Sequence, residues 1–587
     1  WGRHWLDVAR FAESSGKEAN ISFPYAWRYR DYVINSVNAD IPYARFLTEQ
    51  LAGDLLPFDS LDERARLLIA TGFLAVGTKN LDAMNALQFQ ADIVDEQIDT
   101  TTRAILGSSL ACARCHDHKF EPFSMKDYYA LAGIFASTKT YFGTAVSPAN
   151  RVGGDPLPLP SEAGLPVYHK SIKPEKVAQL KAAMAKLRQE EMEGRTAVFK
   201  AIKEGRDASG IFTLRDALRI FWRTGSIEGQ LEKVGSDGKA LPLAMGVRDR
   251  EKIIDVPLLK RGEIGQPGEI VARAFPAALD VEATKTFRKD ASGRLEFAQW
   301  LTRPKHPLTS RVMVNRLWKH LFGQGLVATV DDFGSTGRPP SHPQLLDHLA
   351  LRFVENGWSV KTMIRELVLS RTYRQASTWR KGAFVSDPDN KLLWRMPKRR
   401  LEAEAIRDAM LAVSGEIDLT RPKASLVGRV IGDRPVSLIG LDKRLPKDLD
   451  GSVHRSVYLP VIRDRLPDVL ELFDFASSSF VTGAREKTNV PTQALYLMNS
   501  PFVQDRAAAL ANRVRKEAGD DRTAGLRFAF QLCFARSPTM DEESSALDFL
   551  SAGSAQPDTA DDSNAQADAL SSFCQAILST AEFRNLD

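Results

Sequence analysis

The sequence predicts a mainly α-helical, multidomain protein with a small β-rich unit in the middle of the chain. Its 587 residues are too many for one hydrophobic core. Apolar residues recur every three or four positions near both ends, which is typical of helices that pack on a core. In the middle, short β-prone runs are interrupted by Gly and Pro.

The predicted N-terminal helical domain covers residues 1–143. Helical periodicity is clearest in "RARLLIATGFLAV" and in "ADIVDEQIDTTTRAILGSSLACARC", which ends in a pair of cysteines. Ser124, with Asp127 three residues later, predicts the start of another helix. The cysteines are therefore expected in the connection between two helices.

Residues 144–294 are predicted to hold a linker, a helical hairpin and the small β unit. The stretch "KPEKVAQLKAAMAKLRQEEMEGRTAVFKAIKEG" is charged and amphipathic, whereas "VPLLKRGEIGQPGEIVARAF" is β-prone around a Gly-Gln-Pro-Gly turn. The predicted C-terminal helical domain covers residues 295–587. We expect the two helical ends to pack together, with the middle as an appendage.

Composition and charge argue against two kinds of partner. No run of about twenty apolar residues is present, so no membrane span is expected. The net charge is only +5, and the basic run that ends at Arg400 is followed at once by Glu402 and Glu404. This run is more typical of a solvated helix start than of a nucleic-acid site. The chain starts at Trp1 without a signal-like run, so a leader is expected to be removed or absent, and location has to be predicted from chemistry.

The strongest motif lies in "SSLACARCHDHKFEPF", where Cys112, Cys115 and His116 form Cys-x-x-Cys-His. This is the pattern for covalent attachment of a c-type haem. Two thiols at this spacing can form thioethers with the two vinyl groups of a porphyrin. The adjacent His116 then becomes an axial ligand of the haem iron, which is the metal of this site. One haem c per chain is the favoured prediction.

Two alternatives to haem stay open for the motif. Zinc could in principle take Cys112, Cys115, His116 and His118, although four ligands within seven residues would strain a tetrahedron. A Cys112–Cys115 redox pair or a purely structural role is the second alternative, but a thioredoxin-like βαβ pattern is missing. Cys533 and Cys574 lie among apolar residues and are expected to be buried thiols.

Haem attachment also predicts a location. The reaction needs reduced thiols and an exported chain. We therefore expect the protein outside the cytoplasm of a bacterium, in the periplasm of a Gram-negative cell.

The chain resembles planctomycete-type cytochrome-associated proteins, which are built from paired domains of unknown function. The resemblance rests near the N-terminus on "RHWLDVARFAESSG", "LTEQLAGDLLP" and "CARCHDHKFEPFSMKDYYAL". In the C-terminal part it rests on "HPLTSRVMVNRLWKHLFGQGLVATVDDFGSTGRPPSHPQLLDHLA" and "TNVPTQALYLMNSPF". The region before the cysteines is less typical, and no upstream cytochrome domain is present in the sequence.

The resemblance implies an extracytoplasmic bacterial protein with a redox role in carbohydrate breakdown. The predicted function is a haem-dependent oxidoreductase, such as a sugar dehydrogenase, that passes electrons to a cytochrome-type acceptor. Two alternatives are a non-catalytic electron-transfer or scaffold module and a non-haem metal-dependent hydrolase.

Five further residues are catalytic candidates: His118, Arg316, His320, Asp332 and His342. Arg316 and His320 are four apart on one predicted helix, which Gly323 is expected to end, and therefore share a face. Asp332 and His342 lie in a Gly- and Pro-rich stretch, and a histidine near carboxylates can act as a base or ligand.

The loop residues among and beside these candidates have structural alternatives. His118 could cap its own loop, Ser341 a helix and Asp332 a turn. The acidic residues of "ADIVDEQID" are expected to form a solvated helix face rather than a metal site.

Overall fold

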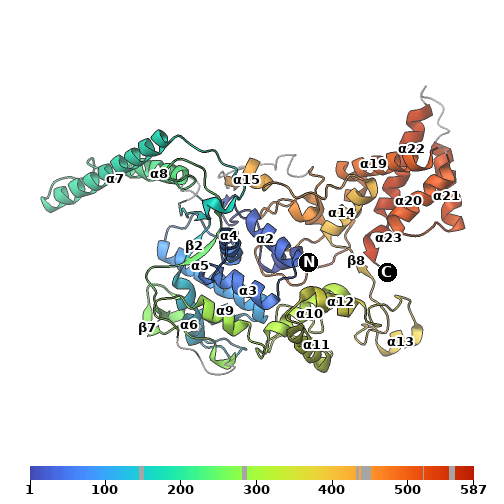
Figure 1. Ribbon diagram of the computed structural model, residues 1–587, viewed down its shortest axis with the longest axis horizontal. Coiled ribbons are helices and arrows are strands. Elements are labelled where there is room, and N and C mark those ends of the chain that lie inside the picture. The colour runs from blue at the N-terminus through green and yellow to red at the C-terminus, as the bar shows by residue number, and fades with distance from the viewer. Residues whose placement is uncertain are drawn as a thin grey trace.

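The computed structural model describes residues 1–144, 151–279, 287–430, 435–437, 451–519, 521–553 and 562–586. Within these ranges helices dominate, and the short strands pair two by two, which confirms the mainly α-helical class. None of the helices in these ranges is long and apolar enough to span a membrane. Figure 1 shows helices gathered in a central body, with a helical hairpin on one side and a helical group on the other.

The N-terminal part forms helices that pack around a shared apolar core. They are α1 (Gly2–Val8), α2 (Trp27–Asn38), α3 (Tyr43–Ala52), α4 (Leu61–Ala70), α5 (Ala86–Thr101) and α6 (Met125–Ala136). The end of α5 continues into a π-helical turn, η3 (Thr102–Leu106), which is followed by the 3-10 turn η4 (Leu110–Arg114). Ser124 and Asp127 form the predicted capping box of α6.

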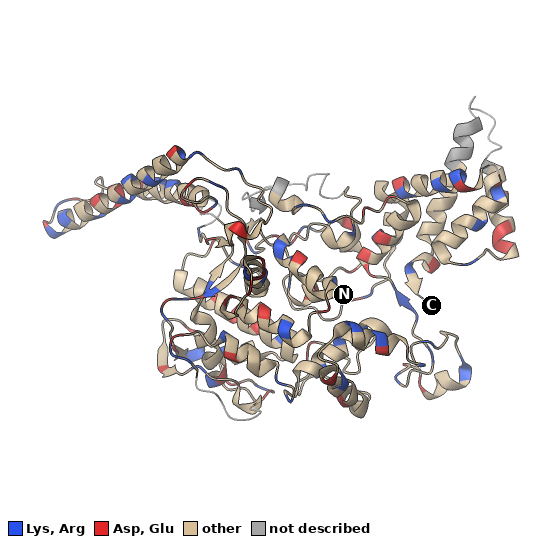
Figure 2. Cartoon of the chain, in the orientation of Figure 1, with Lys and Arg blue, Asp and Glu red and all other residues tan. Residues whose placement is uncertain are grey.

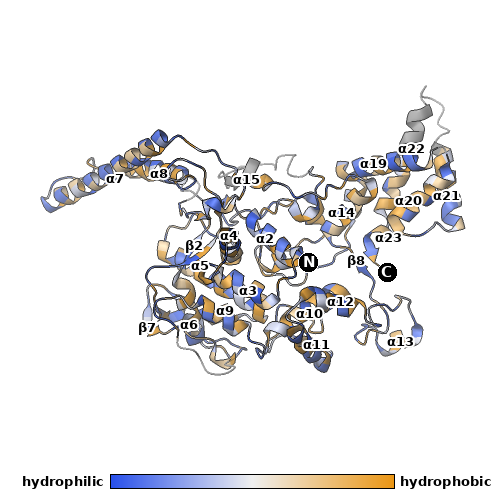
Figure 3. Ribbon diagram, in the orientation of Figure 1, coloured by the Kyte–Doolittle hydropathy of each residue, from blue (hydrophilic) through white to orange (hydrophobic). Residues whose placement is uncertain are grey.

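The middle of the chain combines short strands with a long helical hairpin. The strand pairs are β2 (Thr138–Tyr141) with β5 (Gly246–Asp249), β3 (Leu157–Pro158) with β4 (Leu243–Ala244), and β6 (Val256–Leu259) with β7 (Pro267–Val271). Helices α7 (Pro174–Lys203) and α8 (Leu214–Leu231) lie side by side and project from the body (Figure 1). Polar and apolar residues alternate along both helices (Figure 3), as expected for a pair with one shared apolar seam.

The first hydrophobic core joins regions far apart in the sequence. It contains Leu6 of α1 and Ile105 of η3 together with Trp300, Phe353 and Leu367. The latter three come from α9 (Arg294–Leu301), α11 (Pro343–Glu355) and α12 (Val360–Val368), which accompany α10 (Thr309–Phe322). This core contains residues from both sides of the boundaries predicted at 143/144 and 294/295. The division of the chain into domains at these positions stays a prediction. Residues 145–150 of the predicted linker lie outside the described residues.

A second, smaller core is built by the last part of the chain. Its helices are α14 (Ala403–Ser414), α17 (Asp468–Leu472), α18 (Pro491–Asn499), α19 (Pro501–Ala518), α20 (Arg522–Phe534), α21 (Met540–Gly553), α22 (Asp562–Ser579) and α23 (Ala581–Arg584). Strand β8 (Arg399–Arg400) pairs with β10 (Asn585–Leu586), and β1 (Asn20–Ile21) pairs with β9 (Pro435–Ser437). The short helices α13 (Lys381–Ser386) and α15 (Leu426–Val430) lie in the connections.

Candidate functional site

The Cys-x-x-Cys-His motif lies at the protein surface, in the predicted connection between two helices. Cys112 is in η4, and Cys115 follows its last residue. Both cysteines are exposed and carry free thiols. Elsewhere, Cys574 is buried as predicted and Cys533 is half-buried, and burial raises the pKa of each thiol to about 12. The thiols of Cys112 and Cys115 are therefore the accessible pair among the described cysteines.

His116 is held in an orientation that suits a metal ligand. Its Nδ1 lies 2.7 Å from the carbonyl oxygen of Asp117 and can donate to it. No described residue forms a hydrogen bond with its Nε2. A ligating histidine typically donates its other ring N–H to such an oxygen, because this fixes the tautomer and the ring. The residues of the motif therefore fit an axial-ligand role for His116.

His118 instead organises the loop that carries the motif. Its Nδ1 accepts hydrogen bonds from the backbone N–H groups of Phe120 (3.2 Å) and Glu121 (2.8 Å). Its Nε2 then donates to the hydroxyl of Ser109 at 3.1 Å. Because both ring nitrogens are occupied, the geometry favours the alternative in which His118 caps the loop.

Arg114, one of the two residues between the cysteines, ties the motif to the acidic face of α5. Arg114 lies 3.3 Å from Asp92 and 3.5 Å from Asp95, and Asp95 also accepts from the hydroxyl of Tyr128. Asp99 pairs with Arg103 at 2.7 Å, and Glu96 pairs with Arg10. The expected solvated face is found only in part, because Asp92 is exposed whereas Asp95, Glu96 and Asp99 are half-buried and paired.

Two other segments pack against the motif loop. Gly262, in the turn between β6 and β7, would place a Cβ only 2.7 Å from the sulfur of Cys115. From the C-terminal part, the N–H of Phe333 donates to the carbonyl of Gly107, and the N–H of Ser335 donates to the Glu121 carboxylate, both at 2.8 Å. No local sequence pattern indicates the Gly262 contact, because it depends on long-range packing.

The structure agrees with the predicted capping role of Asp332 but not with that of Ser341. Asp332 accepts from the N–H of Gly334 (3.0 Å) and the hydroxyl of Thr336 (2.9 Å), so it caps the turn. Ser341 is not the N-cap of α11, because the helix begins one residue later, after His342. The segment that contains Asp332 therefore contacts the motif loop, but the carboxylate of Asp332 binds its own turn rather than the motif.

Arg316 is buried and links α10 to the turn that precedes the motif. Its guanidinium donates to the carbonyl oxygens of Arg103 (3.0 Å) and Ala104, and to the carboxylate of Asp331 (2.9 Å). The two carbonyls belong to the last turn of η3, and that of Arg103 also accepts from the N–H of Gly107 at 3.2 Å. Arg316 therefore holds the two halves of the first core together.

His320 lies at a junction that no sequence pattern predicts. Its ring stacks on the ring of His4 from α1, with centroids 3.6 Å apart and planes inclined by 20°. The Nδ1 of His4 lies 3.6 Å from a carboxylate oxygen of Glu402, which immediately precedes α14. Burial lowers the pKa of both histidines well below the usual value, so the neutral rings are favoured. We call His4, His320 and Glu402 the junction cluster.

A buried ion-pair network surrounds the junction cluster. Arg485 donates to Asp7 at 2.8 Å and to both oxygens of Glu404 at 2.6 and 2.8 Å. Although burial opposes its charge, Asp7 and Glu404 raise the pKa of Arg485 well above its usual value. The charged residues that interrupt the apolar helix in "RHWLDVARF" were a signal for such a network, but Arg485 follows Asp7 by 478 positions.

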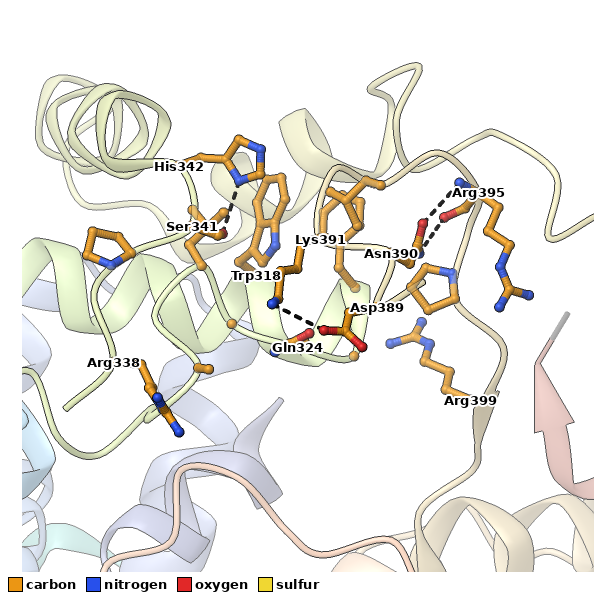
Figure 4. A pocket seen from close by; sticks show the side chains of 18 of the residues that line it. Trp318, Gln324, Arg338, Ser341, His342, Asp389, Asn390, Lys391, Arg395 and Arg399 are labelled. Atoms are coloured by element: carbon orange, nitrogen blue, oxygen red, sulfur yellow. Dashed lines mark hydrogen bonds and ion pairs between the residues drawn. The ribbon is translucent and has the colours of Figure 1, made fainter. Parts of the chain in front are cut away.

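His342 lies in a separate, cationic cleft of about 1050 Å³. Six of the lining residues are Lys or Arg, and one is acidic: Arg338, Lys391, Arg395, Lys398, Arg399 and Lys487, with Asp389. Figure 4 shows Lys391 and Asp389 paired between a side formed by Trp318 and His342 and a side formed by Arg395 and Arg399. Figure 2 likewise shows basic residues at β8, which borders the cleft. We call this hollow the cationic cleft.

The predicted site residues thus fall into three places. Cys112, Cys115, His116 and His118 lie in the motif loop, and Asp332 caps a turn in the segment that contacts it. His320 lies at the junction cluster, where Arg316 lines the same small cavity, and His342 lies in the cationic cleft. One segment connects the first and the third, since Ser335 contacts Glu121 while Arg338 and His342 line the cleft. His342 follows Ser335 by seven positions, so their Cα atoms are at most about 25 Å apart.

Comparison with known protein families gives two matches. Residues 1–140 match the model PSCyt2, described as a protein of unknown function (DUF1549). Residues 293–550 match the model PSD1, described as a protein of unknown function (DUF1553). No curated protein and no solved structure matches the chain.

Proposed function

We propose that the chain is a c-type haem protein with a redox function. The two family models that it matches describe paired planctomycete cytochrome-associated domains, which supports this proposal. One observation carries this proposal: two exposed free thiols and an oriented, exposed histidine stand in Cys-x-x-Cys-His order on one surface turn. The haem, when bound, would supply one-electron transfer.

The roles of the residues follow from their chemistry. Cys112 and Cys115 would each add across a vinyl group, so that a C–S bond forms and the thiol hydrogen goes to the neighbouring vinyl carbon. No oxidant is needed for this addition. His116 would offer Nε2 to the iron, while its Nδ1–H remains bonded to the carbonyl of Asp117. Phe120, 56% exposed in the same loop, would offer an apolar side chain to the bound porphyrin.

The surface position of the motif supports electron transfer to a cytochrome-type acceptor. A partner can approach an exposed turn closely, and attachment of this kind takes place outside the cytoplasm. We therefore propose an extracytoplasmic, periplasm-type location. The alternative of a non-catalytic electron-transfer module is supported by the same exposed position of the motif.

Absorption spectroscopy on protein made together with cytochrome c maturation factors tests the proposal. The Soret band should survive extraction with acid and organic solvent, and the intact mass should rise by about one haem per chain. Cys112→Ser with Cys115→Ser should abolish both signals, whereas Cys533→Ser should keep them. Extractable colour, or an unchanged mass, would contradict covalent attachment.

The cationic cleft supports a substrate-oxidising role as a second candidate function. Excess positive charge around a hollow of about 1050 Å³ favours an anionic ligand, such as a sugar that bears carboxylate groups. His342 would accept a hydroxyl proton there. His342→Ala should lower turnover by about a hundredfold or more without changing the haem spectrum. Equal turnover in this variant would leave electron transfer as the function.

A further inference from the structure

The junction cluster has the composition of a transition-metal site. One nitrogen from each imidazole of His4 and His320 and one oxygen of Glu402 lie within 4.8 Å of one another. Two histidines with one carboxylate are the protein ligands of many catalytic zinc sites and of non-haem iron(II) sites. Magnesium and calcium prefer oxygen ligands, so the histidines argue against them.

Two local features leave the ligand atoms available. The Nδ1 of His4 is buried and has no hydrogen-bond partner in the described part of the chain. Such an atom carries a desolvation cost that a metal bond would remove. No described residue forms a hydrogen bond with the ring nitrogens of His320.

The charge balance around the cluster is also compatible with a bound cation. Arg485 is one of the cations beside the cluster, but Asp7 and Glu404 both pair with it at 2.8 Å or less. Its distance to Glu402 is longer, 3.7 Å. Glu402 therefore keeps a carboxylate oxygen for the cluster.

The cluster also borders open space. His4 and His320 line a small cavity of about 60 Å³, together with Trp5, Met313 and Leu317 among others. A volume of this size has room for water. A fourth, exchangeable ligand could therefore reach a metal held by the three side chains.

We propose that His4, His320 and Glu402 bind one divalent transition-metal ion, zinc or iron(II), with an open coordination position. Ligand atoms bound at about 2.0–2.2 Å in a tetrahedron lie about 3.5 Å apart. The three side chains must therefore move together by about 1 Å, and the stacked rings must splay.

The site depends on both matched domains. His4 lies in the segment that matches one family model, and His320 and Glu402 lie in the segment that matches the other. Neither segment holds the three ligands alone. The bound ion would join α1, α10 and the start of α14, which gives a chemical reason for the pairing of the two domains.

Metal titration of the full chain tests this site, in a background that removes competing thiols. In Cys112→Ser/Cys115→Ser protein freed of metal, isothermal titration should show one high-affinity zinc ion per chain. Cobalt(II) should give d–d absorption of a nitrogen- and oxygen-ligated site without a sulfur charge-transfer band. Metal analysis of protein purified without chelator distinguishes zinc from iron. Magnesium and calcium should not compete.

Variants assign the ion to the cluster. His4→Gln, His320→Gln and Glu402→Gln should each weaken zinc binding by about a hundredfold or more, whereas His342→Gln, in the cationic cleft, should leave it unchanged. Circular dichroism identifies any variant that fails to fold, and Glu402→Gln keeps the side-chain shape in that case. Failure to bind zinc, cobalt(II) or iron(II) with micromolar affinity, or binding that all three variants retain, would overturn the proposal.

Discussion

The motif loop and the junction cluster are built in opposite ways. The motif loop takes Cys112, Cys115 and His116 from five consecutive positions and exposes them. The junction cluster takes His4, His320 and Glu402 from three distant segments and places them beside a buried ion-pair network. A surface turn can be changed with little effect on folding, whereas a buried junction cannot. Substitutions in the motif loop should therefore change function without changing the free energy of unfolding. Substitutions at the junction should change both.

The largest expected effect is the loss of Arg485. Arg485→Met leaves Asp7 and Glu404 as buried carboxylates without their main partner, and such uncompensated charge costs about 3–5 kcal/mol. Urea unfolding measures this free energy. Arg188→Met, which removes an exposed ion pair to Glu228 on the hairpin, is the matched control and should cost less than about 1 kcal/mol. Equal losses in the two variants would contradict the contrast between buried and exposed charge.

His306, a buried histidine in the connection between α9 and α10, extends the comparison to pH. Burial, helped by Arg303, lowers the pKa of His306 to about 4, below the usual 6.5. The unfolded chain therefore takes up the proton first as the pH falls. The stability that depends on neutral His306 is present above pH 6.5 and should be lost between pH 6.5 and 4, by up to about 3 kcal/mol.

Unfolding free energies measured across this pH range check the prediction. His306→Gln should make the decline shallower, because Gln does not titrate, and the lowered pKa values of His4 and His320 account for the decline that remains. His348→Gln, at an exposed position of α11, should leave the decline unchanged. A wild-type decline that His306→Gln retains in full would assign the pH dependence to other groups.

Arg316 connects the buried interior with the motif loop, so its loss should have an intermediate effect. Arg316→Met removes the donors to the carbonyls of Arg103 and Ala104 and the partner of Asp331, at a cost of about 2 kcal/mol. Hydrogen exchange should become faster in residues 102–121. Arg311→Met, on the same helix but paired at the surface with Asp347, should change neither quantity. Unchanged exchange in the Arg316 variant would show that the motif loop is held by other contacts.

The smallest effect on stability is expected at the motif itself. Cys112→Ser with Cys115→Ser should change the free energy of unfolding of haem-free protein by less than about 0.5 kcal/mol, because both side chains are exposed. Thermal unfolding measured beside the haem assay checks this. A large loss of stability would mean that the thiols support the fold, contrary to the comparison.

Local signals account for what could be predicted from the sequence. The capping box of Ser124 and Asp127 and the end of α10 at Gly323 are confirmed, because each depends on neighbours within one or two turns. The shared helix face of Arg316 and His320 follows from the same periodicity. The contacts of these two side chains could not be predicted, since they involve Arg103 and His4. In "VTGAREKTN", Arg485 is indistinguishable from a surface charge until the chain is folded.

The first hydrophobic core also affects how the protein is made. Helices α1 to α6 end before Thr144, but they share their core with α9 to α12, which end only at Val368. A ribosome that adds roughly 5–20 residues per second needs about 10–45 s to synthesise the intervening segment. During that time the apolar surfaces that α9 to α12 cover in the folded protein stay open, so a nascent chain stalled near residue 144 should bind a holdase chaperone more strongly than one stalled beyond residue 400.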